Sequence, residues 1–272
     1  MKIYAIANQK GGVGKTTTTV NLAAALAEAG RPTLVIDLDP QANATSGLGI
    51  QPEAGRSLYP VLAGESRFAD QILPTSQENL FLIPCETDLA GCEVEIARQE
   101  TPLGVLRDLF AKFREEPEAA RFEYVLLDCP PSLGILMTNA LAAADAVVVP
   151  LQCEYFALEG LSKIVHLIDQ IRTTNPELRP VIGGIILTMY DARTNLSQQV
   201  ADDVRKHAPE AVFQAVIPRT VRLAEAPSHG KNILQYDPSG IGAQSYRLLA
   251  KEFVERAEAG HDDFTVDAPQ EA

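Results

Sequence analysis

The sequence contains no tryptophan, only four cysteines in 272 residues, and no long hydrophobic run. No apolar stretch approaches the roughly 18 residues that a membrane-spanning helix needs. The five apolar residues between Lys2 and Asn8 are too few for a signal peptide. Because the four cysteines show neither C-x-x-C spacing nor a pairing pattern, they are expected to be reduced thiols. These absences argue against a secreted or membrane-spanning protein and predict a cytoplasmic one.

Basic residues are also scarce, with 23 Lys and Arg against 36 Asp and Glu, for a net charge of −13. A net charge this negative argues against nucleic acid as a partner, because the phosphates would repel the protein. The charge is, however, unevenly distributed. Residues 1–178 carry a net −10, residues 179–251 carry +3, and residues 252–272 carry −6. The stretch from 179 to 251 is therefore locally basic.

Short β-branched runs alternate with helical patterns along most of the chain. Runs such as T-L-V-I-D and Y-V-L-L-D are apolar throughout, which is typical of strands buried on both faces in a parallel sheet covered by helices. The expected strands cover residues 3–8, 33–37, 80–84, 124–128, 146–150, 182–188 and 212–217. The expected helices cover residues 16–29, 88–98, 102–114, 133–143, 158–174, 196–207 and 240–258.

This alternation predicts the α/β class, with a mostly parallel sheet flanked by helices in a single doubly wound domain. Hydrophobic residues make up 46% of the chain, and no internal repeat or Gly/Ser-rich linker divides it. We assign residues 1–257 to this domain. Residues 258–272 have little apolar content and are expected to form a disordered acidic tail.

A glycine-rich phosphate-binding loop follows the first expected strand. The segment K-G-G-V-G-K-T-T (10–17) meets G-x-x-x-x-G-K-[ST] only in part, because Gln9 occupies the position of the first glycine. Glycines let successive backbone N–H groups turn inward at a helix N-terminus and bind phosphate. Lys15 would neutralise the β- and γ-phosphates, and the Thr16 hydroxyl would bind Mg²⁺. The pattern predicts a P-loop NTPase that binds the nucleotide phosphates through Gly11, Gly12, Val13, Gly14, Lys15, Thr16 and Thr17.

Two expected strands end in carboxylates, at the edge of the sheet where such folds bind ligands. The second strand leads into D-L-D-P-Q (37–41), in which Asp37 would support Mg²⁺ through water and Asp39 would orient the attacking water. A capping or turn role before Pro40 is the alternative for both. The strand at 124–128 ends in L-L-D-C-P-P-S, a Walker B pattern in which Asp128 would hold a Mg²⁺-bound water.

Lys10 is an unusual second lysine at the front of the loop, and K-G-G-V-G-K-T-T closely resembles the deviant Walker A motif of the ParA/MinD/Soj class of P-loop ATPases. D-C-P-P-S is similar to the switch II motif of that class, and the segment after Asp37 resembles its switch I. The resemblance implies that Lys10 reaches the partner's phosphates in an ATP-bound sandwich homodimer. It also implies that Asp39 is required for hydrolysis. A solvated Lys10 is the alternative.

Three later segments resemble chromosomal ParA/Soj partition proteins, namely P-L-Q-C-E-Y-F-A-L-E-G-L (150–161), L-T-M-Y-D-A-R-T-N (187–195) and I-P-R-T-V-R-L-A-E-A-P-S-H-G-K (217–231). The acidic end of the chain argues against the basic membrane helix of MinD-type relatives. The early loop argues against an N-terminal helix-turn-helix domain. The resemblance implies a slow ATPase that a ParB/Spo0J-like partner stimulates. The loop containing Pro218 and Arg219, together with Met189, is expected to frame the adenine.

The locally basic stretch supplies candidate DNA contacts. Arg193 and Arg222 match family positions whose arginines bind DNA without sequence preference, and Lys231, Arg247 and Lys251 could extend the patch. Because no reading helix is evident, these contacts would go to phosphate. A nucleotide-dependent dimer would double the patch and bind double-stranded DNA of the nucleoid. Ordinary solvated side chains are the alternative.

Two other functions fit parts of the sequence. A relative of this class could position a protein complex through protein contacts alone, without DNA. An iron–sulfur protein of the nitrogenase type would need paired cysteines, and the candidates Cys129 and Cys153 lack a glycine-rich cluster-binding context. The four histidines show no metal-ligand spacing. An ATPase for chromosome or plasmid partition is therefore the leading hypothesis.

Overall fold

A seven-stranded sheet forms the centre of the computed structural model, which describes residues 1–86, 89–178, 180–260 and 264. The strand order is β3-β4-β2-β5-β1-β6-β7, and every neighbouring pair is parallel except β3 with β4. The doubly wound α/β fold predicted from the sequence is confirmed. The strands are β1 (Lys2–Ile6), β2 (Thr33–Asp37), β3 (Leu73–Pro74), β4 (Leu80–Ile83), β5 (Tyr124–Asp128), β6 (Ala146–Gln152) and β7 (Ile182–Thr188).

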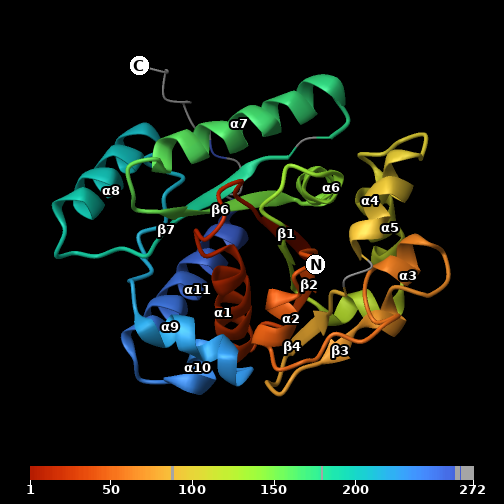
Figure 1. Ribbon diagram of the computed structural model, residues 1–272, viewed down its shortest axis with the longest axis horizontal. Coiled ribbons are helices and arrows are strands. Elements are labelled where there is room, and N and C mark those ends of the chain that lie inside the picture. The colour runs from red at the N-terminus through yellow and green to blue at the C-terminus, as the bar shows by residue number, and fades with distance from the viewer. Residues whose placement is uncertain (87–88, 179, 261–263, 265–272) are drawn as a thin grey trace.

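Helices cover both faces of the sheet (Figure 1). Successive strand residues point to opposite faces, so Ile3 and Ala5 of β1 pack in one core while Tyr4 and Ile6 pack in the other. The first core is covered by α3 (Tyr59–Leu62), α4 (Leu89–Ala97), α5 (Val105–Arg114), α6 (Ile135–Ala143), α7 (Ala157–Thr174) and α8 (Asn195–His207). The second is covered by α1 (Lys15–Glu28), α2 (Asn43–Gly47), α9 (Val221–Glu225), α10 (Ile233–Tyr236) and α11 (Ile241–Ala259).

The strand expected at 212–217 does not form as a continuous strand. This segment makes only isolated bridges with the edge of the sheet, at Val212 with Ile185 and at Pro218 with Tyr190. Between them, the backbone N–H groups of Gln214 and Ala215 donate to the Glu252 carboxylate of α11, at 2.9 and 3.0 Å. The apolar pattern of the segment fits a strand, and the Phe213 and Ile217 N–H groups do donate to the Ile185 and Leu187 carbonyls of β7. The pairing is interrupted between them, where Glu252 accepts the hydrogen bonds.

Gly184 of β7 is a position where a side chain would not fit. Its φ is +153°, and a Cβ there would lie 2.3 Å from the Phe213 ring. We expect Gly184→Ala to lower the free energy of unfolding by about 3 kcal/mol, because ring displacement adds to backbone strain. Thermal unfolding should then shift down by roughly 6–12 °C. Gly30→Ala is the matched control, since Gly30 also has positive φ (+77°) but open space around it. An equal loss in both variants would contradict the packing argument.

Phe264, beyond the last helix, lies beside the edge of the sheet. Helix α11 runs to Ala259, two residues past the predicted domain end, and the Phe264 N–H donates to the Ile182 carbonyl at 3.0 Å. The other residues of the predicted acidic tail beyond Gly260 lie outside the described residues, so that prediction stays a prediction. Within the described ranges, no helix combines the length and the apolar character needed to cross a membrane.

Candidate nucleotide-binding site

The candidate site lies at the carboxyl ends of the central strands. In the pairing register, Asp128 at the end of β5 is opposite both Ile6 of β1 and Asp37 of β2. The phosphate-binding loop begins just after β1 and leads into α1 (Figure 1). The parallel sheet therefore brings this loop and the two carboxylates to one edge, where folds of this kind bind ligands.

Two glycines give the loop its curvature. Gly12 and Gly14 have φ values of +76° and +90°, in the left-handed region that favours glycine, and Gly14 is the N-cap of α1. The Val13 carbonyl accepts a hydrogen bond from the Thr188 hydroxyl at 2.8 Å, which ties the loop to the end of β7. The loop and the first turn of α1 thus present backbone N–H groups and a positive helix end to an anion.

The two lysines of the loop have different positions. Lys15 is buried, and its ammonium donates to the Lys10 carbonyl at 3.2 Å. Burial lowers the pKa of Lys15, while the neighbouring Asp128 carboxylate opposes that shift. The Lys10 ammonium instead lies 3.3 Å from Oε2 of Glu154, and both of these side chains are about half exposed. The Lys15 side chain therefore contacts the backbone of its own loop, whereas the Lys10 side chain extends out of the loop toward Glu154.

Oxygen donors suitable for Mg²⁺ meet at the start of α1. The Thr16 hydroxyl donates to Oδ2 of Asp128 at 2.8 Å, and the Thr19 hydroxyl donates to Oδ1 at 2.9 Å. Burial, with the nearby Asp37 carboxylate, raises the pKa of Asp128 to about 8. A hydroxyl and a carboxylate fit Mg²⁺, which takes few protein ligands and completes its shell with phosphate and water oxygens. The structure brings Thr16 and Asp128 together, and their assignment to Mg²⁺ stays a prediction.

Asp37 and Asp39 hold the segment that follows β2. Both oxygens of Asp37 accept hydrogen bonds, Oδ2 from the N–H and hydroxyl of Thr45 (2.8 and 2.7 Å) and Oδ1 from the Asp39 N–H (3.1 Å). Burial raises the pKa of Asp37 to about 6. These contacts fit support of Mg²⁺ through water better than direct coordination. Asp39 is 8% exposed, and its Oδ1 accepts from the Gln41 N–H at 3.0 Å. Thr45, eight residues after Asp37, was not predicted as part of the site.

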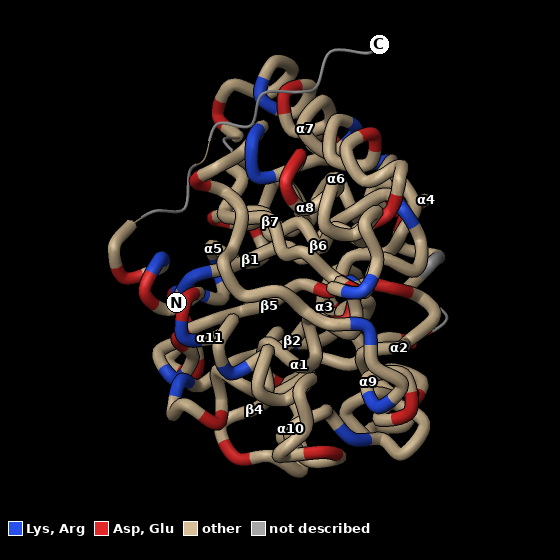
Figure 2. Tube along the Cα trace, turned by 90° about the vertical axis from the view of Figure 1, so that its left-hand side faces the viewer, with Lys and Arg blue, Asp and Glu red and all other residues tan. Residues whose placement is uncertain are grey.

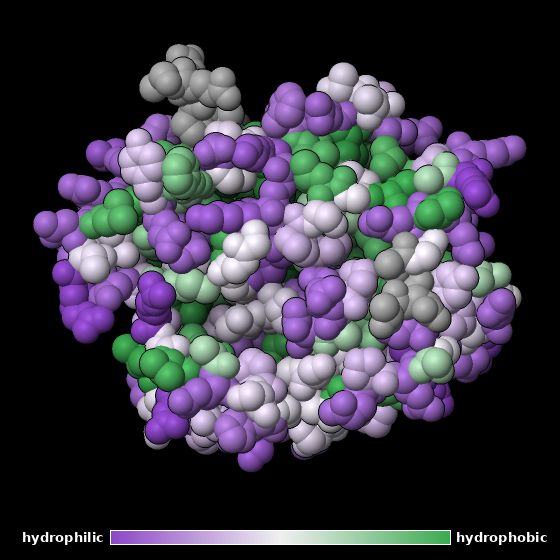
Figure 3. All heavy atoms as spheres, viewed as in Figure 1, coloured by the Kyte–Doolittle hydropathy of each residue, from purple (hydrophilic) through white to green (hydrophobic). Residues whose placement is uncertain are grey.

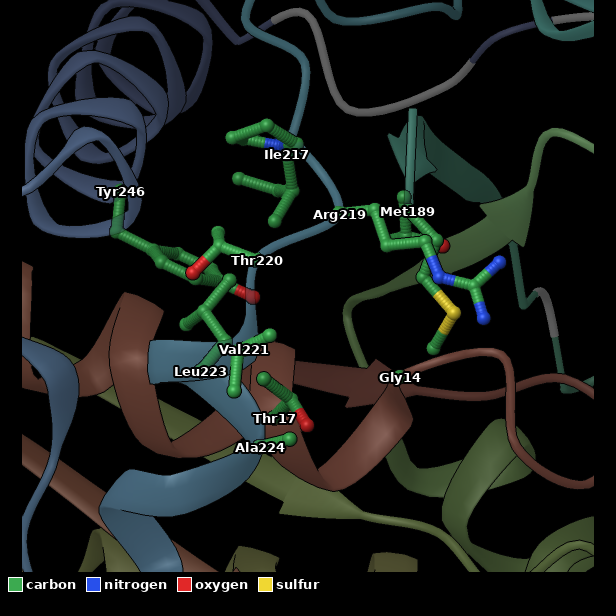
Figure 4. A pocket seen from close by; sticks show the side chains of 12 residues that line it. Gly14, Thr17, Met189, Ile217, Arg219, Thr220, Val221, Leu223, Ala224 and Tyr246 are labelled. Atoms are coloured by element: carbon green, nitrogen blue, oxygen red, sulfur yellow. The ribbon is translucent and has the colours of Figure 1, made fainter. Parts of the chain in front are cut away.

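A cavity of about 350 Å³ adjoins the loop (Figure 4). Met189, Pro218 and Arg219, the three residues expected to frame adenine, all line it. Met189 has a φ of +51°, a strained conformation that is common at functional sites. Green apolar spheres border a hollow at the lower left of Figure 3, over α9. The lining residues that the sequence did not indicate are Thr188, Ile217, Thr220, Val221, Leu223, Ala224 and Tyr246.

Lys and Arg are spread over the surface among Asp and Glu (Figure 2), and the candidate DNA contacts lie on several elements. The Arg193 side chain is 89% exposed and pairs with Asp191 at 2.8 Å. Arg222 lies on α9, also exposed, and pairs with Glu225 at 3.2 Å. Such exposed pairs are weak and open readily to another anion. Both arginines are therefore accessible to phosphate.

The other three basic candidates differ in their surroundings. Lys231 lines a second cavity of about 450 Å³, which it shares with Thr16 and Thr17 of the loop. Arg247 donates to both oxygens of Glu28 (2.5 and 2.9 Å) and to the Pro238 carbonyl, so its guanidinium is largely engaged. Lys251 faces Glu255 at 3.9 Å. The five candidates therefore differ in how far their charges are already engaged within the protein.

The cysteines give no support to an iron–sulfur site. All four are buried, and burial raises the pKa of the Cys129 thiol. In the described part of the chain, no group of three or more His, Cys, Asp or Glu side chains is arranged to hold a metal ion. The cysteines therefore behave as buried core residues.

The amino-acid sequence of the chain is similar to those of known proteins. A family model described as an AAA domain matches residues 1–180. The chain is 48% identical to the chromosome partitioning protein ParA of Myxococcus xanthus, covering 94% of this chain and 88% of that protein. It is 49% identical to the sporulation initiation inhibitor protein Soj of Bacillus subtilis, covering 92% and 97%.

Solved structures with the same fold include a synthase and a cell division ATPase. Cobyrinic acid a,c-diamide synthase from Mycobacterium smegmatis, with bound ADP and magnesium, is 34% identical with a TM-score of 0.81, covering 99% of this chain and 100% of that one. The cell division ATPase MinD of Pyrococcus furiosus is 26% identical with a TM-score of 0.75, covering 93% and 98%.

Proposed function

Since the chain belongs to the ParA/Soj family of P-loop ATPases, we propose that it is a partition ATPase that binds ATP and Mg²⁺, dimerises around ATP, and then binds DNA without sequence preference. The observation that carries this proposal is the separation of the two lysines. Lys15 lies within the loop, and the Lys10 side chain extends from it toward Glu154. A lysine in that position can contact a phosphate bound by another subunit.

Hydrolysis would depend on positioning and electrostatics. The loop N–H groups and Lys15 hold the phosphates, and Lys10 of the second subunit adds positive charge as the γ-phosphate leaves, as an arginine finger does elsewhere. Asp39 orients the attacking water. Mg²⁺ held near Thr16 and Asp128 would neutralise phosphate charge. Hydrolysis to ADP and phosphate would be slow until a ParB/Spo0J-like partner stimulates it.

DNA binding would use phosphate contacts from Arg193 and Arg222, with Lys231, Arg247 and Lys251 as further candidates. Each phosphate contact contributes about −0.9 to the dependence of log affinity on log salt. A dimer presents each contact twice, so ATP would convert weak monomer binding into useful affinity. The unfavourable net charge of −13 makes this dependence on dimerisation stronger. In the cell, the ATP-bound form would associate with the nucleoid.

Arg222→Glu should weaken ATP-dependent binding to duplex DNA of arbitrary sequence by about tenfold or more and reduce the salt slope by about 1 per subunit. Fluorescence anisotropy across a salt series, with a non-hydrolysable ATP analogue, measures both quantities. Lys112→Glu is the matched control, because it makes the same charge change on α5, which covers the opposite face of the sheet. Equal DNA affinity for Arg222→Glu and wild type at every salt concentration would show that the patch is misplaced.

The same measurement separates the alternative function. A protein that positions other proteins without DNA would dimerise with the ATP analogue but show no nucleotide-dependent retention of duplex DNA, even at low salt. Dimerisation together with salt-sensitive DNA binding would support the partition function.

A further inference from the structure

The connection between β6 and α7 is held firmly beside the phosphate-binding loop. The buried Asn8 amide donates to the Pro150 carbonyl at 2.8 Å, and its Oδ1 accepts the Lys10 N–H at 3.0 Å. A Cβ at Gly160, in the first turn of α7, would lie 3.6 Å from the same Oδ1. The Cys153 N–H also bonds to the Thr188 carbonyl at the end of β7. Figure 1 shows the start of α7 beside the red loop that follows β1.

This connection exposes two aromatic rings. Tyr155 and Phe156 are 79% and 58% exposed, and their ring centroids lie 5.1 Å apart in an edge-to-face arrangement. Most large apolar side chains of the chain are instead packed in the two cores. Adjacent exposed aromatic residues on a rigid base are typical of protein–protein contact surfaces, where aromatic side chains supply much of the binding free energy.

Charges next to these rings indicate which partner fits. The positive Lys10 and the negative Glu154 lie side by side, and Oε1 of Glu154 is held by the Gln152 amide. A two-fold axis brings the same patch of both copies together, and a patch that carries both signs of charge can meet its own copy without like charges facing each other. The surface is also continuous with the loop from which Lys10 extends, and under the proposed function Lys10 contacts the nucleotide of a second subunit.

We propose that Tyr155 and Phe156 anchor a second copy of this chain, and that the Lys10–Glu154 pair opens as the two copies meet. This inference rests on the proposed function, because it assigns the contact that forms the ATP-bound dimer. The side chains of the ion pair are 36% and 46% exposed. A pair this exposed contributes little to stability, so releasing Lys10 toward the partner's nucleotide costs little. The aromatic rings form no ion pair that must break when the copies meet, so their burial supplies the net attraction.

The test is the dimer dissociation constant of the double variant Tyr155→Ser/Phe156→Ser. Sedimentation velocity with Mg²⁺ and a non-hydrolysable ATP analogue should show an increase of at least about thirty-fold over wild type. Affinity of the monomer for the analogue, measured by calorimetry at low protein concentration, should be unchanged, because neither ring lines the cavity beside the loop. Ile241→Ser/Leu248→Ser is the matched control, since both residues are 63% exposed on α11. It should dimerise as wild type does.

The outcomes distinguish this inference from the function on which it rests. A wild-type protein that dimerises, with a Tyr155→Ser/Phe156→Ser variant whose dissociation constant lies within threefold of it, would overturn the aromatic contact and leave the partition function standing. An equal weakening in the α11 control would also overturn it, because the effect would then reflect general loss of apolar surface. A wild-type protein that stays monomeric at every nucleotide concentration would refute the proposed dimer itself.

Discussion

Lys15→Ala should abolish nucleotide binding at any concentration used in practice. Its ammonium is buried at the start of α1, close to the carboxylates of Asp128 and Asp39. Removing it takes away a charge-assisted contact with the phosphates, worth about 3 kcal/mol. It also removes the positive charge that offsets the nearby Asp39 carboxylate, which would then repel the nucleotide. Affinity for ADP and Mg²⁺, measured by isothermal titration calorimetry, should fall by at least about 150-fold.

The effect should be confined to binding. The first turn of α1 keeps its backbone bond from Thr18 N–H to the Gly14 carbonyl, which does not involve the Lys15 side chain. Thermal unfolding of the unliganded variant should therefore stay close to that of wild type. Lys112→Ala, which removes an exposed lysine from α5, serves as the control and should bind nucleotide normally. An affinity of Lys15→Ala within tenfold of wild type would contradict the assignment of this lysine to the phosphates.

Asp39→Ala should separate ATP binding from hydrolysis. The Asp39 carboxylate is nearly buried and is fixed by the Gln41 N–H, so it can orient a water molecule without a large rearrangement. Loss of such a group lowers the rate constant of the chemical step by about a hundredfold or more. ATP and Mg²⁺ should still bind, because the loop and Lys15 are unchanged. Single-turnover hydrolysis should be slow, and gel filtration with ATP should show a persistent dimer.

Asp203→Ala is the control for this second variant. Asp203 lies on α8, where it faces Lys206 at 3.6 Å and takes no part in the candidate site. Its removal should leave the hydrolysis rate within twofold of wild type. An unchanged steady-state rate of ATP hydrolysis in Asp39→Ala would exclude Asp39 as the residue that orients the water. A capping or turn role before Pro40 would then explain the aspartate at this position.

The phosphate-binding part of the site could be predicted from the sequence because its residues are close together in the chain. The loop is eight consecutive residues between a strand and a helix, and the carboxylates directly follow apolar strands. The parallel pairing of β2, β5 and β1 then fixes where Asp37 and Asp128 meet. Each of these relations is local or follows from the fold class, so a pattern in the sequence is enough to find it.

The cavity beside the phosphate-binding loop and the irregular edge of the sheet could not be predicted in the same way. Thr188 reaches the cavity from the end of β7, Leu223 from α9 and Tyr246 from α11, so no spacing in the sequence relates them. The segment 212–217 has the composition of a strand, but Glu252 takes its central N–H groups. Glu154 likewise faces Lys10 across 144 residues of chain. These features depend on tertiary contacts that override local preference.

Phe264 determines where a reporter can be attached to this protein. Its N–H pairs with Ile182 on the edge strand β7, and its ring lies 5.4 Å from the Arg256 guanidinium. A chain shortened to residue 260 would leave that part of the edge open to strands of other molecules, a known route to aggregation. A fluorescent protein or dye joined after residue 264 keeps the pairing intact. Images of a shortened fusion could therefore show clusters that arise from the truncation and not from DNA segregation.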